Sequence, residues 1–137
     1  MSSINLVGRD RNTPYRDKGM LNVPVAAGEV IPAGFIVVVN AAGYAELGTA
    51  ATGLTYIGRA EEFVDNTDGL NGDVSILVKT DKAFQFANSS TDPVTQASFG
   101  KLCYIANGET VAETDASGTL SPAGIVVGID QDGVWVQ

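Results

Sequence analysis

Beyond residue 20, the chain alternates short apolar runs with glycine, asparagine and aspartate. Several runs are rich in β-branched residues, which favour strands, and the residues between the runs are typical of turns. This pattern predicts a meander of short strands. The predicted strands are Asn22–Ala26, Phe35–Val39, Tyr44–Leu47, Thr55–Glu61, Val74–Val78, Ala83–Ala87, Leu102–Ala106, Thr110–Glu113, Gly124–Ile129 and Val134–Val136.

Four local signals refine this prediction. The run Phe35–Val39 is apolar at every position, which indicates a strand buried on both faces. Pro24 is compatible only with a sheet edge, and Gly58 indicates a bulge or a close backbone contact. Asn107-Gly108 is the strongest hairpin signal in the chain.

One short segment has helical signals. Thr91 or Asp92 is a suitable cap, Pro93 suits the first helical position, and Gly100 suits the end. The sequence therefore predicts one short helix within residues 91–100.

A weak internal repeat accompanies the strand pattern. Residues 35–61 and residues 102–130 both have a strand, a turn containing asparagine, a second strand, a Thr/Ala/Gly-rich loop and a third strand. In this comparison, Gly58 corresponds to Gly128. Two such units are expected to pack face to face, so the predicted fold is a small all-β barrel or sandwich of short hairpins.

The first 20 residues differ from the rest of the chain. Residues 1–18 contain four basic and two acidic residues, a net charge of +2, whereas the remaining 119 residues contain four basic and 14 acidic residues, a net charge of −10. No hydrophobic period is present, and Thr13-Pro14 interrupts the segment. Residues 1–20 are predicted to form an extended arm and residues 21–137 a single all-β domain. The arm is either a frayed terminus or a segment that becomes ordered on a partner.

Composition excludes several classes of function. A length of 137 residues suits one domain, and a net charge of −8 argues against nucleic-acid binding, which needs a basic surface. The absence of histidine removes the commonest general base and transition-metal ligand. A single cysteine excludes an internal disulfide or a cysteine-based zinc cluster.

No catalytic constellation is evident, so we expect no enzymatic activity, no cofactor and no metal. Glu61 and Glu62 are adjacent carboxylates, but neighbours on a strand point to opposite faces. Cys103 lies in an apolar strand pattern and is interpreted as a small core residue. The aspartate-rich stretch 65–73 does not match a calcium-binding loop and is interpreted as a solvated turn.

No targeting signal is recognised. The N-terminal residues contain no apolar stretch of signal-peptide length, and the longest apolar run is far shorter than the roughly 20 residues of a membrane span. We expect synthesis in the cytoplasm and no membrane association.

The residue pattern from about 20 to 137 resembles the head decoration (cement) proteins of tailed bacteriophages, in particular the lambda type. The order of elements is a strand with a glycine turn, a Thr-rich loop, a strand with an Ile/Val-Gly motif and a strand with two phenylalanines. The residues that carry this resemblance are Val39–Gly43, Gly48–Thr55, Ile57–Ala60, Phe84–Phe86, Ala97–Tyr104, Asn107-Gly108 and Val127–Ile129.

The resemblance implies a β-tulip-like, non-enzymatic protein that binds the outer surface of an expanded capsid and stabilises it. Its expected partner is the major capsid protein of a tailed phage, its expected oligomer is a homotrimer, and its expected location is the virion after synthesis in the bacterial host. An N-terminal arm that becomes ordered on the shell is also implied. The candidate capsid-binding residues in this arm are Ile4, Leu6, Val7, Arg9, Arg11, Tyr15, Arg16 and Lys18.

Two other functions remain open at this stage. A carbohydrate- or cell-surface-binding β-module needs exposed aromatic side chains, and the candidates are Tyr44, Tyr56, Tyr104 and Trp135. Their positions in strand patterns favour a core or interface role. The second of these functions is an enzyme that uses only carboxylates, for which Glu61 and Glu62 are the candidates.

Overall fold

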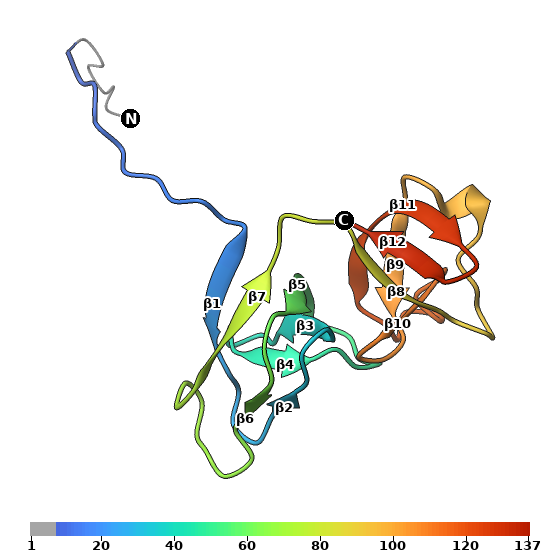
Figure 1. Cartoon of the computed structure of the whole chain (residues 1–137), viewed down its shortest axis with the longest axis horizontal. Coiled ribbons are helices and arrows are strands. Elements are labelled where there is room, and N and C mark those ends of the chain that lie inside the picture. The colour runs from blue at the N-terminus through green and yellow to red at the C-terminus, as the bar shows by residue number, and fades with distance from the viewer. Residues whose placement is uncertain (1–7) are drawn as a thin grey trace, which may run out of the picture.

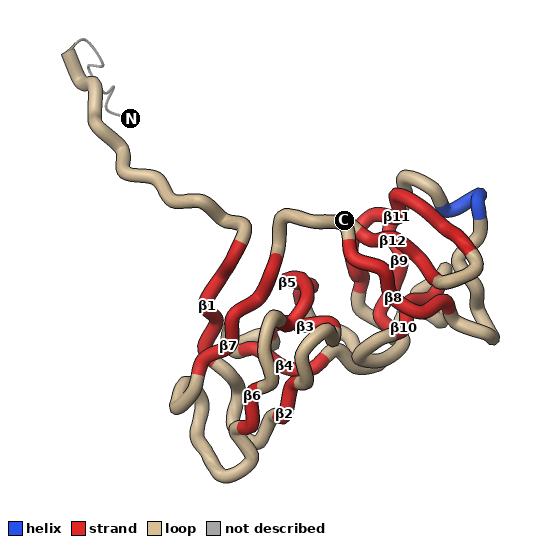
Figure 2. Tube along the Cα trace, viewed as in Figure 1, coloured by secondary structure: helices blue, strands red, loops and turns tan. Residues whose placement is uncertain are grey.

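The computed structural model describes residues 8–137, whose regular secondary structure consists almost entirely of short strands joined by turns and loops (Figure 1, Figure 2). This is a small all-β fold, as the sequence predicts. An extended segment before β1 projects away from the body (Figure 1). The elements are β1 (Met20–Pro24), β2 (Val30–Ile31), β3 (Ile36–Val39), β4 (Ala45–Leu47), β5 (Thr55–Ala60), β6 (Val64–Asp65), β7 (Ser75–Lys79), β8 (Phe84–Asn88), the 3-10 turn η1 (Gln96–Ser98), β9 (Leu102–Ile105), β10 (Thr110–Ala112), β11 (Pro122–Asp130) and β12 (Gly133–Val136).

The strands up to β7 form one lobe, residues 20–79, called the N-lobe here. Its five-stranded sheet has the order β1-β7-β5-β3-β4, and β2 and β6 form a separate two-stranded ribbon. Pro24 lies on β1, the outermost strand of this sheet, which confirms its predicted edge position. A parallel bridge between Val25 and Ala45 brings the end of β1 to β4 and begins to close the sheet.

The remaining strands form the C-lobe, residues 84–137, a closed five-stranded barrel. Its order is β10-β8-β12-β11-β9, and a short parallel pairing of β8 with β10 closes it. The predicted hairpin around Asn107-Gly108 is confirmed, because β9 and β10 pair antiparallel with Ile105 opposite Val111. Residues 80–83 connect the lobes, so β7 and β8 are consecutive strands that belong to different sheets.

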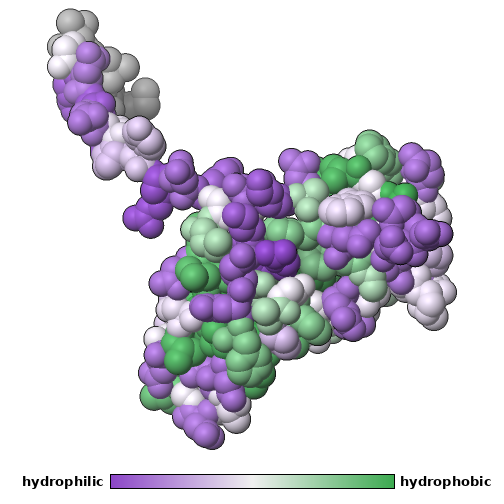
Figure 3. Space-filling view, viewed as in Figure 1, coloured by the Kyte–Doolittle hydropathy of each residue, from purple (hydrophilic) through white to green (hydrophobic). Residues whose placement is uncertain are grey.

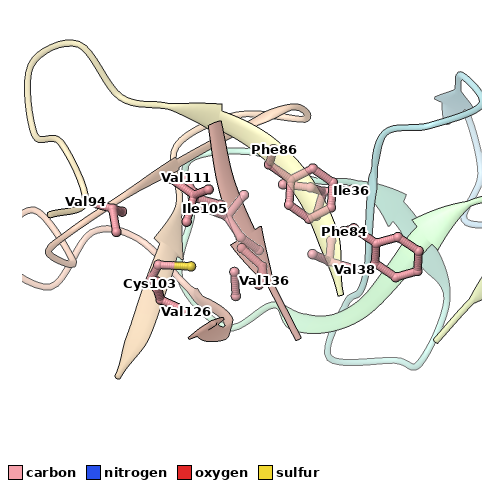
Figure 4. Packing of buried hydrophobic residues seen from close by; sticks show 12 residues of the cluster. Ile36, Val38, Phe84, Phe86, Val94, Cys103, Ile105, Val111, Val126 and Val136 are labelled. Atoms are coloured by element: carbon pink, nitrogen blue, oxygen red, sulfur yellow. The ribbon is translucent and has the colours of Figure 1, made fainter. Parts of the chain in front are cut away.

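Each lobe has its own hydrophobic cluster, and β3 contributes to both. Val37 belongs to the cluster of the N-lobe, whereas its neighbours Ile36 and Val38 belong to the cluster of the C-lobe. Figure 4 shows Ile36 and Val38 beside Phe84 and Phe86 of the barrel. All three β3 residues are fully buried, which confirms the predicted two-sided burial. The alternation of side chains along a strand therefore places one strand between two cores.

The two lobes have the same topology. Replacing β1, β3, β4, β5 and β7 by β8, β9, β10, β11 and β12 converts the sheet order of the N-lobe into that of the C-lobe. The parallel contact between first and third strands is also shared, since the bridge Val25–Ala45 corresponds to the pair Asn88–Val111. The repeat noted in the sequence thus extends to five strands in each lobe.

The strand registers match residue by residue. Ile36 lies opposite Arg59 in the N-lobe, and Leu102 lies opposite Ile125 in the C-lobe. Both pairings shift register before the second residue beyond these pairs, where Val38 lies opposite Tyr56 and Tyr104 lies opposite Pro122, so the bulge is repeated as well.

A glycine at the bulge is repeated for a steric reason. A Cβ on Gly58 would lie 2.2 Å from the carbonyl oxygen of Lys79, and a Cβ on Gly124 would lie 1.9 Å from that of Gln137. The close contact predicted at Gly58 is therefore confirmed, but its predicted counterpart Gly128 is wrong. Gly128 instead lies under the Trp135 ring. The two units do not share one sheet or barrel, because each forms its own lobe.

The predicted helix is reduced to a single 3-10 turn at Gln96–Ser98. The amide nitrogen of Val94 donates to Asn88 Oδ1 at 2.8 Å, and Asn88 Nδ2 donates to the Val94 carbonyl at 2.9 Å. These bonds hold the backbone of Val94 against β8, so it is not free to begin a helix. Val94 packs into the barrel, whereas Phe99 is exposed.

Candidate functional site

The candidate capsid-binding residues of the arm do not converge on the body. Arg9, Arg11, Tyr15, Arg16 and Lys18 are all exposed, Tyr15 by 95%. Within residues 8–137, none of these cations forms an ion pair with the body. The candidates Ile4, Leu6 and Val7 lie outside the described residues.

The arm is attached to the body where β1 begins. The Thr80 hydroxyl donates to the carbonyl oxygen of Lys18, and the Thr80 amide donates to that of Gly19 at 3.0 Å. Figure 3 shows a predominantly hydrophilic surface along the segment before β1. The body therefore anchors the arm at one end and leaves its side chains available.

Glu61 and Glu62 do not form a paired acid site. Glu61 Oε2 lies 2.5 Å from Arg59 Nη2, and Glu62 Oε1 accepts a hydrogen bond of 3.2 Å from the Leu77 amide. Each carboxylate therefore has its own structural partner along β5 and β7.

Cys103 is fully buried in the barrel, as predicted for a core residue. Its thiol donates to the Gly124 carbonyl at 3.5 Å, and burial raises its pKa to about 12. A thiol that stays protonated at neutral pH is a poor nucleophile, so Cys103 serves the core.

The stretch 65–73 is partly a buried structural turn, and the prediction of a solvated turn fails at Asn66. The Asn66 amide is buried and donates to the carbonyls of Ala26 at 3.0 Å and Leu70 at 3.1 Å. The Asp65 carboxylate accepts hydrogen bonds from the side chain and backbone of Thr67, which lower its pKa. The Asn66 side chain therefore ties the loop to the segment that follows β1, while the Asp65 bonds stabilise the turn locally.

Among the four candidate aromatic residues, Trp135 is the one that is exposed, by 38%, while Tyr44, Tyr56 and Tyr104 are half-buried. The indole Nε1 donates to Asp130 Oδ2 at 3.1 Å. Asp130 also accepts a hydrogen bond of 3.3 Å from Gln85 Nε2. The bond from Trp135 is the largest of the contacts that lower the pKa of Asp130. The carboxylate therefore holds the ring in a defined orientation on the barrel.

A cavity of about 260 Å³ lies between the lobes. One wall comes from β5 and the residue before it, and the other comes from β9 and β11 of the C-lobe. The lining residues are Leu54, Thr55, Tyr56, Leu102, Pro122 and Ala123. Most of the lining is apolar, and no ionisable carboxylate or amine faces the cavity.

Two polar atoms on β5 lie buried near this boundary without a hydrogen-bond partner in residues 8–137: the Tyr56 hydroxyl and Arg59 Nε. Burial raises the pKa of the Tyr56 phenol further above its usual range. The Arg59 guanidinium lies 5.0 Å from the ring centroid of Phe84, and this contact joins β5 of one lobe to β8 of the other.

No helix in residues 8–137 has the length and hydropathy needed to cross a membrane. Comparison of the chain with models of protein families, with curated proteins and with solved structures gave no match. Sequence reasoning missed the structural role of Asn66, the repeated contact at Gly124 and the boundary between the lobes. The signal for the repeated contact in the sequence was a glycine in the segment that forms β5 and another in the segment that forms β11.

Proposed function

We propose that this chain is a non-enzymatic structural protein that binds the outer surface of an expanded phage capsid and stabilises it. The observation that carries this proposal is the arm: its described part, residues 8–18, has no regular secondary structure and exposed side chains, and its charge is opposite to that of the body. Its expected partner is the major capsid protein.

The physical basis is strand addition combined with charge selection. An extended segment forms backbone hydrogen bonds with a sheet edge, and Arg9, Arg11 and Arg16 form charge-assisted bonds with carboxylates on the shell. The apolar surface of Tyr15 adds contact area at low conformational cost. An acidic body facing solvent opposes nonspecific binding to DNA, and several linked arms on one oligomer multiply the affinity.

Co-sedimentation with expanded capsid shells tests this proposal. We expect saturable binding by the full chain and much weaker binding by a variant that lacks residues 1–18. The triple variant Arg9→Gln, Arg11→Gln and Arg16→Gln is expected to bind weakly, whereas the matched variant Lys82→Gln and Lys101→Gln on the body is expected to bind normally. Absence of binding by the full chain would contradict the function, and equal binding by the truncated chain would contradict the role of the arm.

A second candidate function is recognition of a carbohydrate, and the oriented Trp135 ring favours it. An exposed indole flanked by an amide (Gln85) and a carboxylate (Asp130) is suited to stack on a sugar and to bond its hydroxyls. Glycan-array binding that is lost in Trp135→Ala would support this function. Absence of binding to every glycan on the array by the folded protein would contradict this function.

A further inference from the structure

The two lobes differ in how one equivalent face is covered. In the N-lobe, Ile36 and Val38 of β3 are 0% exposed because they pack into the cluster of the C-lobe. The register makes Leu102 the counterpart of Ile36 and Tyr104 the counterpart of Val38. In the C-lobe, Leu102 is 47% exposed and Tyr104 is half-buried.

This uncovered face continues onto the neighbouring strand. Ile125 lies opposite Leu102 and is 44% exposed, and Pro122 lies opposite Tyr104 and is exposed as well. Leu102 and Pro122 also line the cavity between the lobes, so this face begins at the mouth of that cavity and extends outward to Ile125. The four residues contribute no charge. Cross-strand pairs of large apolar side chains on an outer face are unusual unless something covers them. We call these four residues the open face of the C-lobe.

The surface of the C-lobe that contacts β3 and β5 also has a counterpart in the N-lobe. In the C-lobe, Phe84 lies under the Arg59 guanidinium, and Ile105 shares a cluster with Ile36. Val78 and Val136 are equivalent, because they lie opposite the equivalent residues Ala60 and Val126. Leu21 pairs with Val78 and Phe84 pairs with Val136, so Leu21 is the N-lobe counterpart of Phe84. Leu21 is half-buried, whereas Phe84 is 7% exposed.

Val39 is likewise the N-lobe counterpart of Ile105, since the two residues lie opposite Ala45 and Val111. Val39 is half-buried, whereas Ile105 is fully buried. The N-lobe therefore has a less completely covered version of the surface that receives β3 in the C-lobe. Leu21 and Val39 define this receiving surface.

We propose that the open face of the C-lobe docks on the receiving surface of the N-lobe of a second copy of this chain. The two surfaces are the unused halves of a contact that the chain already forms within itself. Such a contact is heterologous, because it joins different surfaces of the two copies, and heterologous contacts close into rings or extend into fibres. In a closed ring every open face is covered, and in a fibre every open face except the terminal one is covered. This inference does not depend on capsid binding.

Sedimentation equilibrium at micromolar concentrations tests the docking. The wild-type chain is expected to self-associate, and Ile125→Glu is expected to abolish association by placing a charge in the apolar contact. Leu70→Glu is the matched control, since Leu70 is an exposed residue on a loop of the N-lobe, and it is expected to associate normally. A monomeric wild type, or association that survives in Ile125→Glu, would overturn the proposal.

A mixing experiment tests the heterologous geometry. Leu21→Glu removes the receiving surface but keeps the open face, and Ile125→Glu does the reverse. Each variant alone is expected to be monomeric, and an equal mixture is expected to form a dimer through the one intact pair of surfaces. A mixture that stays monomeric would overturn the proposed geometry.

Two further variants separate the alternatives. Val39→Glu replaces Leu21→Glu if the latter fails to fold, as judged by circular dichroism. A chain lacking residues 1–18 is expected to associate as the full chain does, and loss of association on truncation would assign the contact to the arm and overturn docking through the lobes. Capsid binding is measured separately, so failure of this proposal leaves the capsid proposal standing.

Discussion

The N-lobe and the C-lobe have one topology but close differently. In the C-lobe, two residue pairs join β8 to β10, whereas in the N-lobe a single bridge joins Val25 to Ala45. The segment that contains β2 lies along β4 in the N-lobe: the Leu47 amide donates to Glu29 Oε1 at 2.8 Å, and the Ala26 amide donates to the Ala45 carbonyl at 2.9 Å. In the N-lobe, the segment that contains β2 thus takes the place of the strand pairing that closes the barrel of the C-lobe.

The lobes also differ in the composition of equivalent outward positions. Ile125 of the C-lobe corresponds to Arg59 of the N-lobe, and the arginine lies over Phe84 in the contact between lobes. Core positions are apolar in both lobes, whereas the residue type at an outward position depends on what that position contacts. Strand order therefore follows from an internal pattern that both lobes share, whereas the chemistry of outward positions follows from the neighbouring groups.

The largest expected loss of folding stability comes from substituting the two equivalent glycines, Gly58 and Gly124. Gly124→Ala places a methyl group against the Gln137 carbonyl, and Gly58→Ala places one against the Lys79 carbonyl. We expect each to destabilise its lobe by at least about 3 kcal/mol, because backbone must move to relieve the overlap. Chemical denaturation measures the loss.

Gly100→Ala is the control for these variants. Gly100 has a positive φ of 83° but no atom within 4 Å of a Cβ, so conformational strain is its main cost. We expect a loss of about 1 kcal/mol. Equal losses for Gly100→Ala and Gly124→Ala would show that the close carbonyl contact is not the cause.

The next largest loss of stability is expected for substitutions on β3, the strand that contributes to both hydrophobic clusters. Val38→Ala and Val37→Ala each remove buried methyl groups at a cost of about 2 kcal/mol, but from different clusters. The rate at which Cys103 is alkylated under native conditions reports opening of the C-lobe. We expect Val38→Ala to raise this rate by about thirtyfold and Val37→Ala to change it little.

Equal acceleration by both β3 variants would contradict separate opening of the lobes. It would mean that the N-lobe and the C-lobe unfold as one cooperative unit. Hydrogen exchange on β7 and β12 distinguishes the two cases independently, because each strand belongs to one lobe.

A smaller effect is expected at the contact between lobes. Arg59→Gln removes the cation over Phe84 and the ion pair with Glu61. We expect a loss of about 0.5–1 kcal/mol, since the side chain is partly exposed and water screens both interactions. Glu61→Gln, which keeps the cation, separates the two contributions in denaturant titrations.

The smallest effect concerns acid pH. The hydrogen bond from Trp135 lowers the pKa of Asp130, so this contribution to stability is present above the unfolded pKa of about 3.9 and is lost as pH falls through the lower folded value. Trp135 is the single tryptophan, and its fluorescence is expected to change below about pH 4. Asp130→Asn is expected to remove this transition, and a transition that persists in Asp130→Asn would assign it to another group.

Much of the strand pattern could be predicted from the sequence because it depends on local periodicity. The edge position of Pro24, the two-sided burial of Phe35–Val39 at its centre and the hairpin at Asn107-Gly108 are all confirmed. The helix in 91–100 was wrong because the side chain of Asn88, outside that segment, binds the backbone of Val94. The role of the arm in binding a capsid stays a prediction.

The all-β class and the contrast between a basic N-terminal segment and an acidic body can both be obtained from the sequence. Alternation of apolar residues and turn residues acts over a few positions, so it is readable without knowledge of the partner strands. Only the tertiary structure decided that β3 serves two cores and that Gly124, not Gly128, repeats Gly58. These facts depend on register between distant segments, and a shift of one residue reverses which face every side chain occupies.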